Sequence, residues 1–443
     1  MHLRPVPAWI AATLLLGALA GCGKSLPGGA SQNRGAGVTT VPGVGALAAS
    51  GLATRNTTRL GGASPLADAA AVALAVNPGL TPATRPSAVV LVNENDWPAA
   101  LAAAALASPP LGAPLLYSDG NTLPAISGEA LAAMKPRGSP LLGGAQVIEI
   151  GTSAAPAGYR TRSLATATAD TASTAVARAL SASLAARIER LVARVHGGPP
   201  HHVIVFGADG PRALAMPAAG LAAESGAPVL PVDAAGIPPA TRRVLASLSR
   251  PVIYAVGPPA AVSRAVLAQL ARFGAVRRID AGPGASGAPG ASGEALANAI
   301  AVARYSDGTF GWGIEEPGHG LVFANASRPL DAPAAAPLSA SGDFGPLLLL
   351  EAPGPVPSVL AEYLSNIQPR YPEYQPARGF YNHGWLIGDE AALAAKTQAE
   401  LDAMLETAPR ATPAAPSSTT TDSAPAATTT GSSPPPATST TSP

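Results

Sequence analysis

A pattern of an apolar strand, an alanine-rich helix and a second apolar strand ending in an acid recurs three times along this 443-residue chain. The two strand segments of the successive copies are 88–92 and 112–119, 202–206 and 226–233, and 320–323 and 345–351. Repetition at this scale indicates an array of small units. The strands are continuous apolar runs without alternation, as expected when helices cover both faces of a parallel sheet. We therefore predict an α/β fold of three tandem, small, Rossmann-like units.

The two ends of the chain differ in composition from its middle. Residues 1–21 have a short basic start and an apolar segment too short to span a bilayer, which is typical of an export signal. The segment ends in Leu-Ala-Gly before Cys22, the pattern of a bacterial lipobox, so the only cysteine is the predicted lipidation site. A plain signal peptide that leaves a free thiol is the alternative. We predict a flexible linker at 22–56 and a disordered Pro/Thr/Ser-rich tail at 409–443.

The chemistry-bearing residues exclude several function classes. The net charge is +1 and charged residues make up 12% of the chain, with no dense basic run, which argues against nucleic acid as a partner. The six histidines occur in no zinc-binding pattern, and neither a nucleophile elbow nor a phosphate-binding loop is present. We therefore predict no metal, no cofactor and no enzymatic activity.

Several short motifs recur with the copies. Arg-containing strands open them at 58–62, 161–164 and, loosely, 277–280, and similar Ala-Pro strands occur at 113–116 and 227–230. With these motifs, residues 57–408 resemble the bacterial cell wall-binding repeat 2 family. The resemblance implies a monomer of three repeats, at 57–157, 158–270 and 271–408, packed as a triangular pseudo-trimer that holds an anionic wall polymer. A signature aspartate of the family is replaced by Ala99 and Arg212 in the first two copies and is kept as Asp331 in the third.

Polar residues at the expected carboxyl ends of the strands are candidate polymer contacts, because ligands of parallel α/β sheets bind there. These candidates are Asn95, Asp96, Asp119 and Asp209, together with the signature Asp331. Arginines at the copy openings are further candidates, because guanidinium groups pair with phosphate in a two-pronged way. They are Arg59, Arg162 and Arg277. The alternatives are helix capping for the acids and internal ion pairing for the arginines.

The combined prediction is a lipoprotein on the outer face of the cytoplasmic membrane, facing the cell wall. Its three repeats would bind a wall polymer or glycan noncovalently, with avidity exceeding that of any single site. A solute-binding lipoprotein of a transporter is one alternative, which predicts two lobes and one cleft. A repeat scaffold that contacts only proteins is the other.

Overall fold

The computed structural model describes residues 52–164, 174–282, 291–340, 344–351, 354–370 and 381–408. The predicted signal peptide, Cys22, nearly all of the predicted linker and the predicted tail lie outside these residues. Every described residue belongs to one compact unit.

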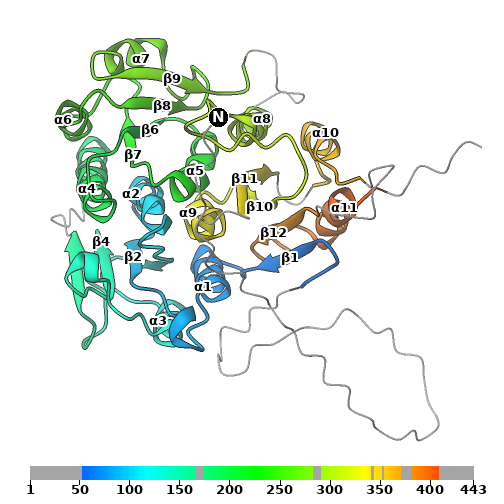
Figure 1. The fold of residues 1–443 in the computed structure, drawn as a ribbon, viewed down its shortest axis with the longest axis horizontal. Helices are drawn as coiled ribbons and strands as arrows, with labels where there is room; N and C mark the ends of the chain where they lie inside the picture. Colours follow the sequence, from blue (N-terminus) through cyan, green and yellow to red (C-terminus); the bar gives the residue numbers. More distant parts are fainter. Residues whose placement is uncertain are drawn as a thin grey trace, which may run out of the picture. The chain divides into compact units, whose positions relative to one another are not determined.

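Three parallel sheets of four strands each make up the framework, which confirms the predicted α/β class (Figure 1). The strand order of the first sheet is β3-β2-β4-β5, that of the second is β7-β6-β8-β9, and that of the third is β11-β10-β12-β1. The strands of the first sheet are β2 (Val89–Asn93), β3 (Leu115–Ser118), β4 (Val147–Ile150) and β5 (Thr161–Leu164). Those of the second are β6 (His202–Gly207), β7 (Val229–Val232), β8 (Val252–Val256) and β9 (Ala275–Ile279). Those of the third are β1 (Thr57–Leu60), β10 (Gly320–Asn325), β11 (Phe344–Leu350) and β12 (His383–Ile387).

The strand that opens each sequence copy pairs with the last strand of another copy. Strand β5 opens the second copy and pairs with β4, and β9 opens the third and pairs with β8. Strand β1 opens the first copy and pairs with β12, with Arg59 opposite Leu386. The ranges 57–157, 158–270 and 271–408 therefore do not each contain one complete sheet. The exchange is cyclic, so the first described strand completes the third sheet.

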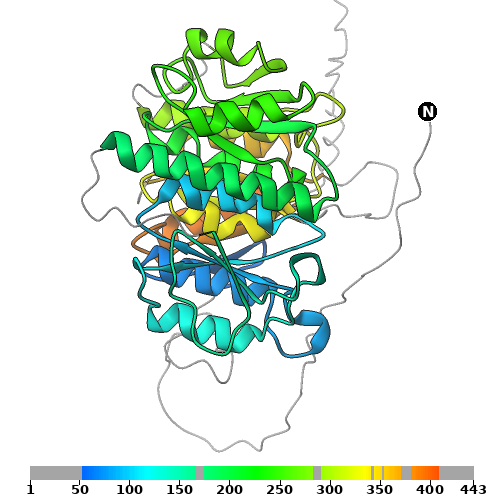
Figure 2. The same cartoon turned by 90° about the vertical axis from the view of Figure 1, so that its left-hand side faces the viewer.

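Helices cover the sheets on both faces. Their bounds are α1 (Pro65–Val76), α2 (Trp97–Ala103), α3 (Ala125–Met134), α4 (Thr174–Val195), α5 (Pro217–Ser225), α6 (Pro239–Ser247), α7 (Arg264–Leu270), α8 (Ala291–Arg304), α9 (Asp331–Ala335), α10 (Ser358–Asn366) and α11 (Ala395–Leu405). The 22-residue helix α4 runs along the side of the molecule and contacts α2 and β5 as well as α6 and β7 (Figures 1 and 2). It therefore joins the first sheet to the second.

Helices associated with all three sheets pack together in one shared core. Helix α5 contacts the 3₁₀ turns η2 (Ala104–Ala107) and η5 (Ala336–Ser339), and α9 contacts α1, α2 and α5. Small side chains permit this close approach. At Gly220 in α5, a Cβ would lie 2.9 Å from the Ser339 Oγ of η5, so the contact has no room for a side chain. The alanine-rich segments of the sequence thus form the seam between the three sheets.

Candidate functional site

Two of the predicted polymer contacts meet at the carboxyl edge of the first sheet. The side chain of Asn93, the last residue of β2, accepts hydrogen bonds from the backbone N–H groups of Asn95 (3.1 Å) and Gly120 (3.2 Å). These bonds fold the turns after β2 and β3 toward each other. The Asn95 amide then donates to the Asp119 carboxylate at 3.3 Å, and both side chains are exposed. The pair presents an amide and a carboxylate to solvent.

The side chain of Asp96 makes hydrogen bonds within the protein. Its carboxylate caps α2 by accepting from the Ala99 N–H at 3.1 Å, and it also accepts from the Ser181 hydroxyl of α4 at 2.8 Å. Burial raises the pKa of Asp96, and these two hydrogen bonds oppose the rise. The capping interpretation therefore describes this residue, which connects the start of α2 to α4.

The second sheet places a pair of acids at its carboxyl edge. Asp209 follows β6, forms an ion pair with Arg178 of α4 and accepts from the Ala234 N–H at 2.9 Å. Burial and the nearby Asp209 carboxylate raise the pKa of Asp233, which follows β7. The positions after β6 and β7 correspond to those of Asn95 and Asp119 in the first sheet.

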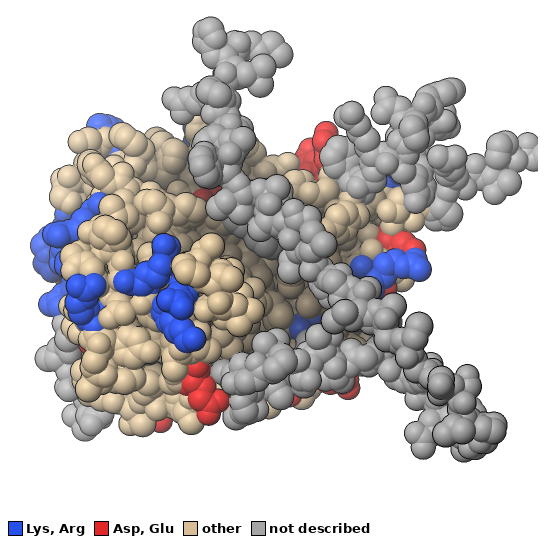
Figure 3. All heavy atoms as spheres, turned by 60° about the horizontal axis from the view of Figure 1, so that its bottom comes forward, with Lys and Arg blue, Asp and Glu red and all other residues tan. Residues whose placement is uncertain are grey.

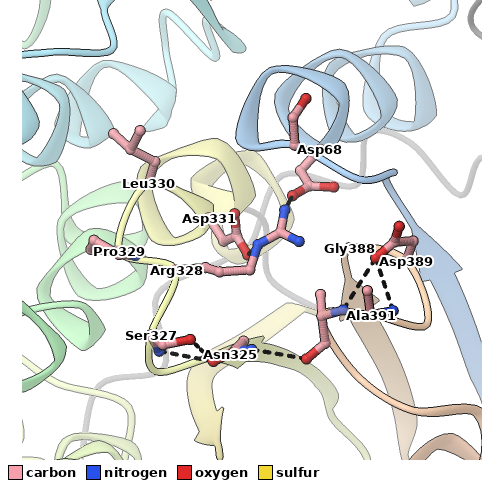
Figure 4. A network of polar contacts seen from close by, with 12 residues as sticks. Asp68, Asn325, Ser327, Arg328, Pro329, Leu330, Asp331, Gly388, Asp389 and Ala391 are labelled. Carbon is pink, nitrogen blue, oxygen red and sulfur yellow. Dashed lines mark hydrogen bonds and ion pairs between the residues drawn. The ribbon is translucent and has the colours of Figure 1, made fainter. Parts of the chain in front are cut away.

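In the third sheet the corresponding turn, after β10, is occupied by a buried charged cluster (Figure 4). Arg328 forms an ion pair with Asp68 of α1, and its Nε lies 2.9 Å from Oδ2 of Asp331 at the start of α9. Both carboxylates are fully buried, whereas the arginine side chain is 17% exposed. Asp68 also accepts from the Gly62 N–H at 2.7 Å.

One guanidinium therefore faces two buried carboxylates. Burial raises the pKa of Asp331, and the adjacent Asp68 carboxylate raises it further against the opposing effect of Arg328. Burial also raises the pKa of Asp68, while the Gly62 N–H and Arg328 lower it. Burial and the neighbouring carboxylate thus act in the same direction on Asp331, so the pair is expected to hold a proton to higher pH than an isolated carboxyl group would.

The turn that carries this cluster also contacts the first sheet. The carbonyl of Pro329 accepts from Trp97 Nε1 at 3.0 Å, and the carbonyl of Leu330 accepts from the Tyr117 hydroxyl at 2.6 Å. Asp331 thus lies at a junction between sheets and does not face solvent. In the second copy, where Arg212 replaces the signature acid, the Arg212 guanidinium lies 5.8 Å from the centre of the Trp97 ring.

The three arginines of the opening strands differ in their surroundings. Arg59 is buried, and its guanidinium donates to Gln398 Oε1 (3.0 Å) and to the carbonyls of Gly388 (3.0 Å) and Asp389 (2.7 Å). Arg277 is exposed and forms an ion pair with Asp307. Arg162 makes no ion pair within the described residues, and its buried Nε has no hydrogen-bond partner there.

The sequence pointed to Asp331 and to Arg328 as polar groups near the strand ends, but Asp68 and the meeting of the three residues were missed. The clearest signal of the cluster is Asp68, a single acid inside an otherwise apolar, alanine-rich helix. A charge in such a segment indicates a buried partner, because an unpaired buried carboxylate destabilises the folded state by roughly several kcal/mol. The partner itself lies 260 residues away and has no local signal.

Two cavities lie apart from the Asn95–Asp119 and Asp209–Asp233 pairs. One of about 460 Å³ is lined by α8 and α10, with Asp280, Arg304 and Glu362 among its polar groups. Another of about 330 Å³ lies beside His196, His201 and His202. Among the described residues, no group of side chains is suited to hold a metal ion. None of the described helices has the length and apolar character needed to cross a bilayer.

Comparisons with known proteins bear on the fold. No family model matches the sequence, and no curated protein matches it. Among solved structures, Cwp6 from Clostridium difficile superimposes with a TM-score of 0.56 at 17% sequence identity. The match covers 76% of this chain and 46% of that chain, so the chain corresponds to less than half of that protein. In its fold, this three-sheet chain is therefore similar to Cwp6 from Clostridium difficile.

Proposed function

We propose that the chain is a cell-envelope protein that binds a cell-wall glycan or polymer noncovalently, without catalysis. The observation that carries the proposal is the repetition of one parallel sheet three times around a shared helical core. The repeat motifs that resemble the cell wall-binding family and the fold likeness to Cwp6 support it. Lipid attachment at Cys22 would hold the protein on the membrane facing the wall.

The polar pairs at two carboxyl edges fit a hydroxyl-rich ligand, and Asn95, Asp119 and Asp209 are exposed whereas Asp233 is half-buried. The amide of Asn95 and the carboxylates of Asp119, Asp209 and Asp233 offer donors and acceptors on neighbouring turns. Carboxylates accept hydrogen bonds from hydroxyl groups, and such bonds are stronger than those between neutral groups. The third sheet differs, because its turn is occupied by the buried Arg328 cluster. We therefore propose two sugar-contacting edges at corresponding positions of the first and second sheets, and a third that is structural.

A sedimentation experiment tests this function. The chain from residue 22 onward, carrying Cys22→Ser, is mixed with cell walls that are intact or stripped of their secondary polymer. Sedimentation with intact walls alone identifies the secondary polymer as the ligand, whereas equal sedimentation with both identifies peptidoglycan. Absence from both pellets rejects the proposal.

Substitutions test whether the carboxyl edge of the first sheet contacts the wall ligand. Asn95→Ala combined with Asp119→Ala removes the exposed pair of the first sheet, and we expect it to weaken wall binding about tenfold. The control is Glu129→Gln, which changes an exposed acid on α3 away from that edge. Equal binding by the two variants would exclude the first-sheet edge as a contact.

A further inference from the structure

Although the net charge of the chain is near zero, its basic and acidic residues are concentrated in different parts of the sequence. Residues 52–282 contain 19 Lys and Arg against 12 Asp and Glu, whereas residues 283–408 contain 5 against 14. The first two sheets therefore lie mostly in basic sequence and most of the third in acidic sequence. Figure 3 shows Lys and Arg side chains gathered on one side of the displayed face, where few acids accompany them. Such a division creates a field that orients the protein near a charged surface.

Four of these cations converge at the amino-terminal edge of the first sheet. The Arg137 N–H donates to the Pro86 carbonyl at 3.0 Å, which brings the segment with Lys135 and Arg137 beside Arg85. The side chain of Gln146 connects the segment at Pro136 to the segment at Arg160. Its amide nitrogen donates to the Pro136 carbonyl (2.9 Å), and its oxygen accepts from the Arg160 N–H (3.1 Å). We call Arg85, Lys135, Arg137 and Arg160 the basic edge.

The charges of the basic edge are not neutralised by carboxylates within the described residues. Within the described residues, none of its four side chains forms an ion pair. Lys135, Arg137 and Arg160 are exposed, and Arg85 is half-buried. The contrast is with Arg178, Arg277 and Arg328, each of which has a carboxylate partner.

Exposed aliphatic side chains lie among these cations. Leu80 is 77% exposed and Leu141 is 45% exposed, both unusual for leucine. Leu80 adjoins Gly79, which lies against the backbone of Met134 next to Lys135. Leu141 belongs to the turn η3 (Pro140–Leu142), which is flanked by Gly138 and Gly144, and the Arg160 guanidinium lies over both glycines.

We propose that the basic edge, with Leu80 and Leu141, docks onto an anionic lipid surface. The cations would contact phosphate headgroups, and the two leucines would enter the apolar boundary beneath them. Exposed leucines distinguish this partner from an anionic polymer, because a hydrated polyanion gives an aliphatic side chain nothing to bury against. The acidic third sheet would be repelled by the same surface, which fixes one orientation of the protein. This inference is independent of the proposed wall binding.

Vesicle sedimentation tests the docking surface. Residues 22–443 with Cys22→Ser, and therefore without a lipid anchor, are mixed with vesicles of phosphatidylcholine, with or without phosphatidylglycerol. We expect sedimentation only with the anionic vesicles, and about tenfold weaker binding when the salt is raised from 50 to ~200 mM, because the surface potential is screened.

Two edge variants and one control separate the contributions. Lys135→Glu with Arg160→Glu should reduce binding to anionic vesicles at least tenfold. Leu80→Ser with Leu141→Ser should weaken binding at every salt concentration. The control is Arg264→Glu with Arg272→Glu, which makes the same charge change at exposed sites on and after α7, and it should bind nearly as the parent does.

Three results would overturn the proposal. One is failure of the parent to bind anionic vesicles. Another is an equal loss in the edge and control charge variants, since that would show an effect of net charge alone. The third is loss of binding to purified anionic wall polymer, but not to vesicles, in the edge variant, which would assign the edge to the polymer. Circular dichroism of each variant establishes that it is folded.

Discussion

Arg328 of the third sheet's turn and Asp68 of α1 form an ion pair between segments 260 residues apart in the sequence. The pair fastens the turn after β10 to the helix that follows β1, at the place where the chain closes its cycle of exchanged strands. Asp331 approaches the same guanidinium from the start of α9. The stability of this junction depends on charge and should respond to mutation and to pH.

Arg328→Met should be strongly destabilising. It preserves most of the side-chain volume but leaves Asp68 and Asp331 without a cation, and removing one member of a buried ionic cluster costs about 3–5 kcal/mol. Urea unfolding measures the change, with the exposed Arg264→Met as control, which should stay within about 0.5 kcal/mol of the parent. A loss equal to that of the control would show that the ionic cluster contributes little.

Asp331→Asn should change the pH dependence of stability. Because its pKa is raised to about 9 in the folded protein, Asp331 keeps its proton where the unfolded chain releases it. The folded state therefore binds more protons, and the free energy of unfolding should fall as pH rises from about 4 toward 9. Asparagine cannot titrate, so the slope between pH 5 and 8 should flatten. Unfolding at several pH values checks this, and an unchanged slope would refute it.

Arg59→Lys should destabilise the fold without affecting ligand binding by the folded protein. Lysine cannot reproduce the fork that reaches Gln398 and two carbonyls, and leaving buried hydrogen-bonding groups unpaired costs about 1–3 kcal/mol. Arg162→Lys is a matched control, because it alters the equivalent opening arginine in β5, whose Nε has no hydrogen-bond partner among the described residues. Weaker wall binding by folded Arg59→Lys protein would restore Arg59 as a polymer contact.

Asp96→Ala should cost about 0.5–2 kcal/mol, the usual effect of removing an N-cap. The loss includes the hydrogen bond to Ser181, so Ser181→Ala should produce part of the same effect. A double-mutant cycle measured by thermal unfolding gives the coupling between the two residues. A coupling of zero would show that Asp96 acts as a cap alone.

The local part of the fold was predictable, whereas its long-range pairing was not. The apolar runs at 88–92, 202–206 and 320–323 match β2, β6 and β10, because a buried strand needs a continuous apolar segment. The exchange of β1 into the third sheet has no local signal. Strand β1 is four residues long, and its partner β12 follows more than 300 residues later.

The candidate site was likewise predictable only in part. The meeting of Asn95 and Asp119 follows from the rule that neighbouring parallel strands bring their carboxyl ends together. The interior use of Arg59 and Asp331 does not follow from any motif, because burial depends on which segments pack over a residue. The basic edge was likewise invisible, since its cations come from three separate loops and no dense run of them exists.

The pairing of β1 with β12 also determines when the third sheet can be completed. Strand β1 is synthesised first among the described strands and β12 last, so the third sheet stays open at β1 until nearly the whole described chain has been made. Because contacts of high sequence separation form slowly, completion of the third sheet should be a late step of folding.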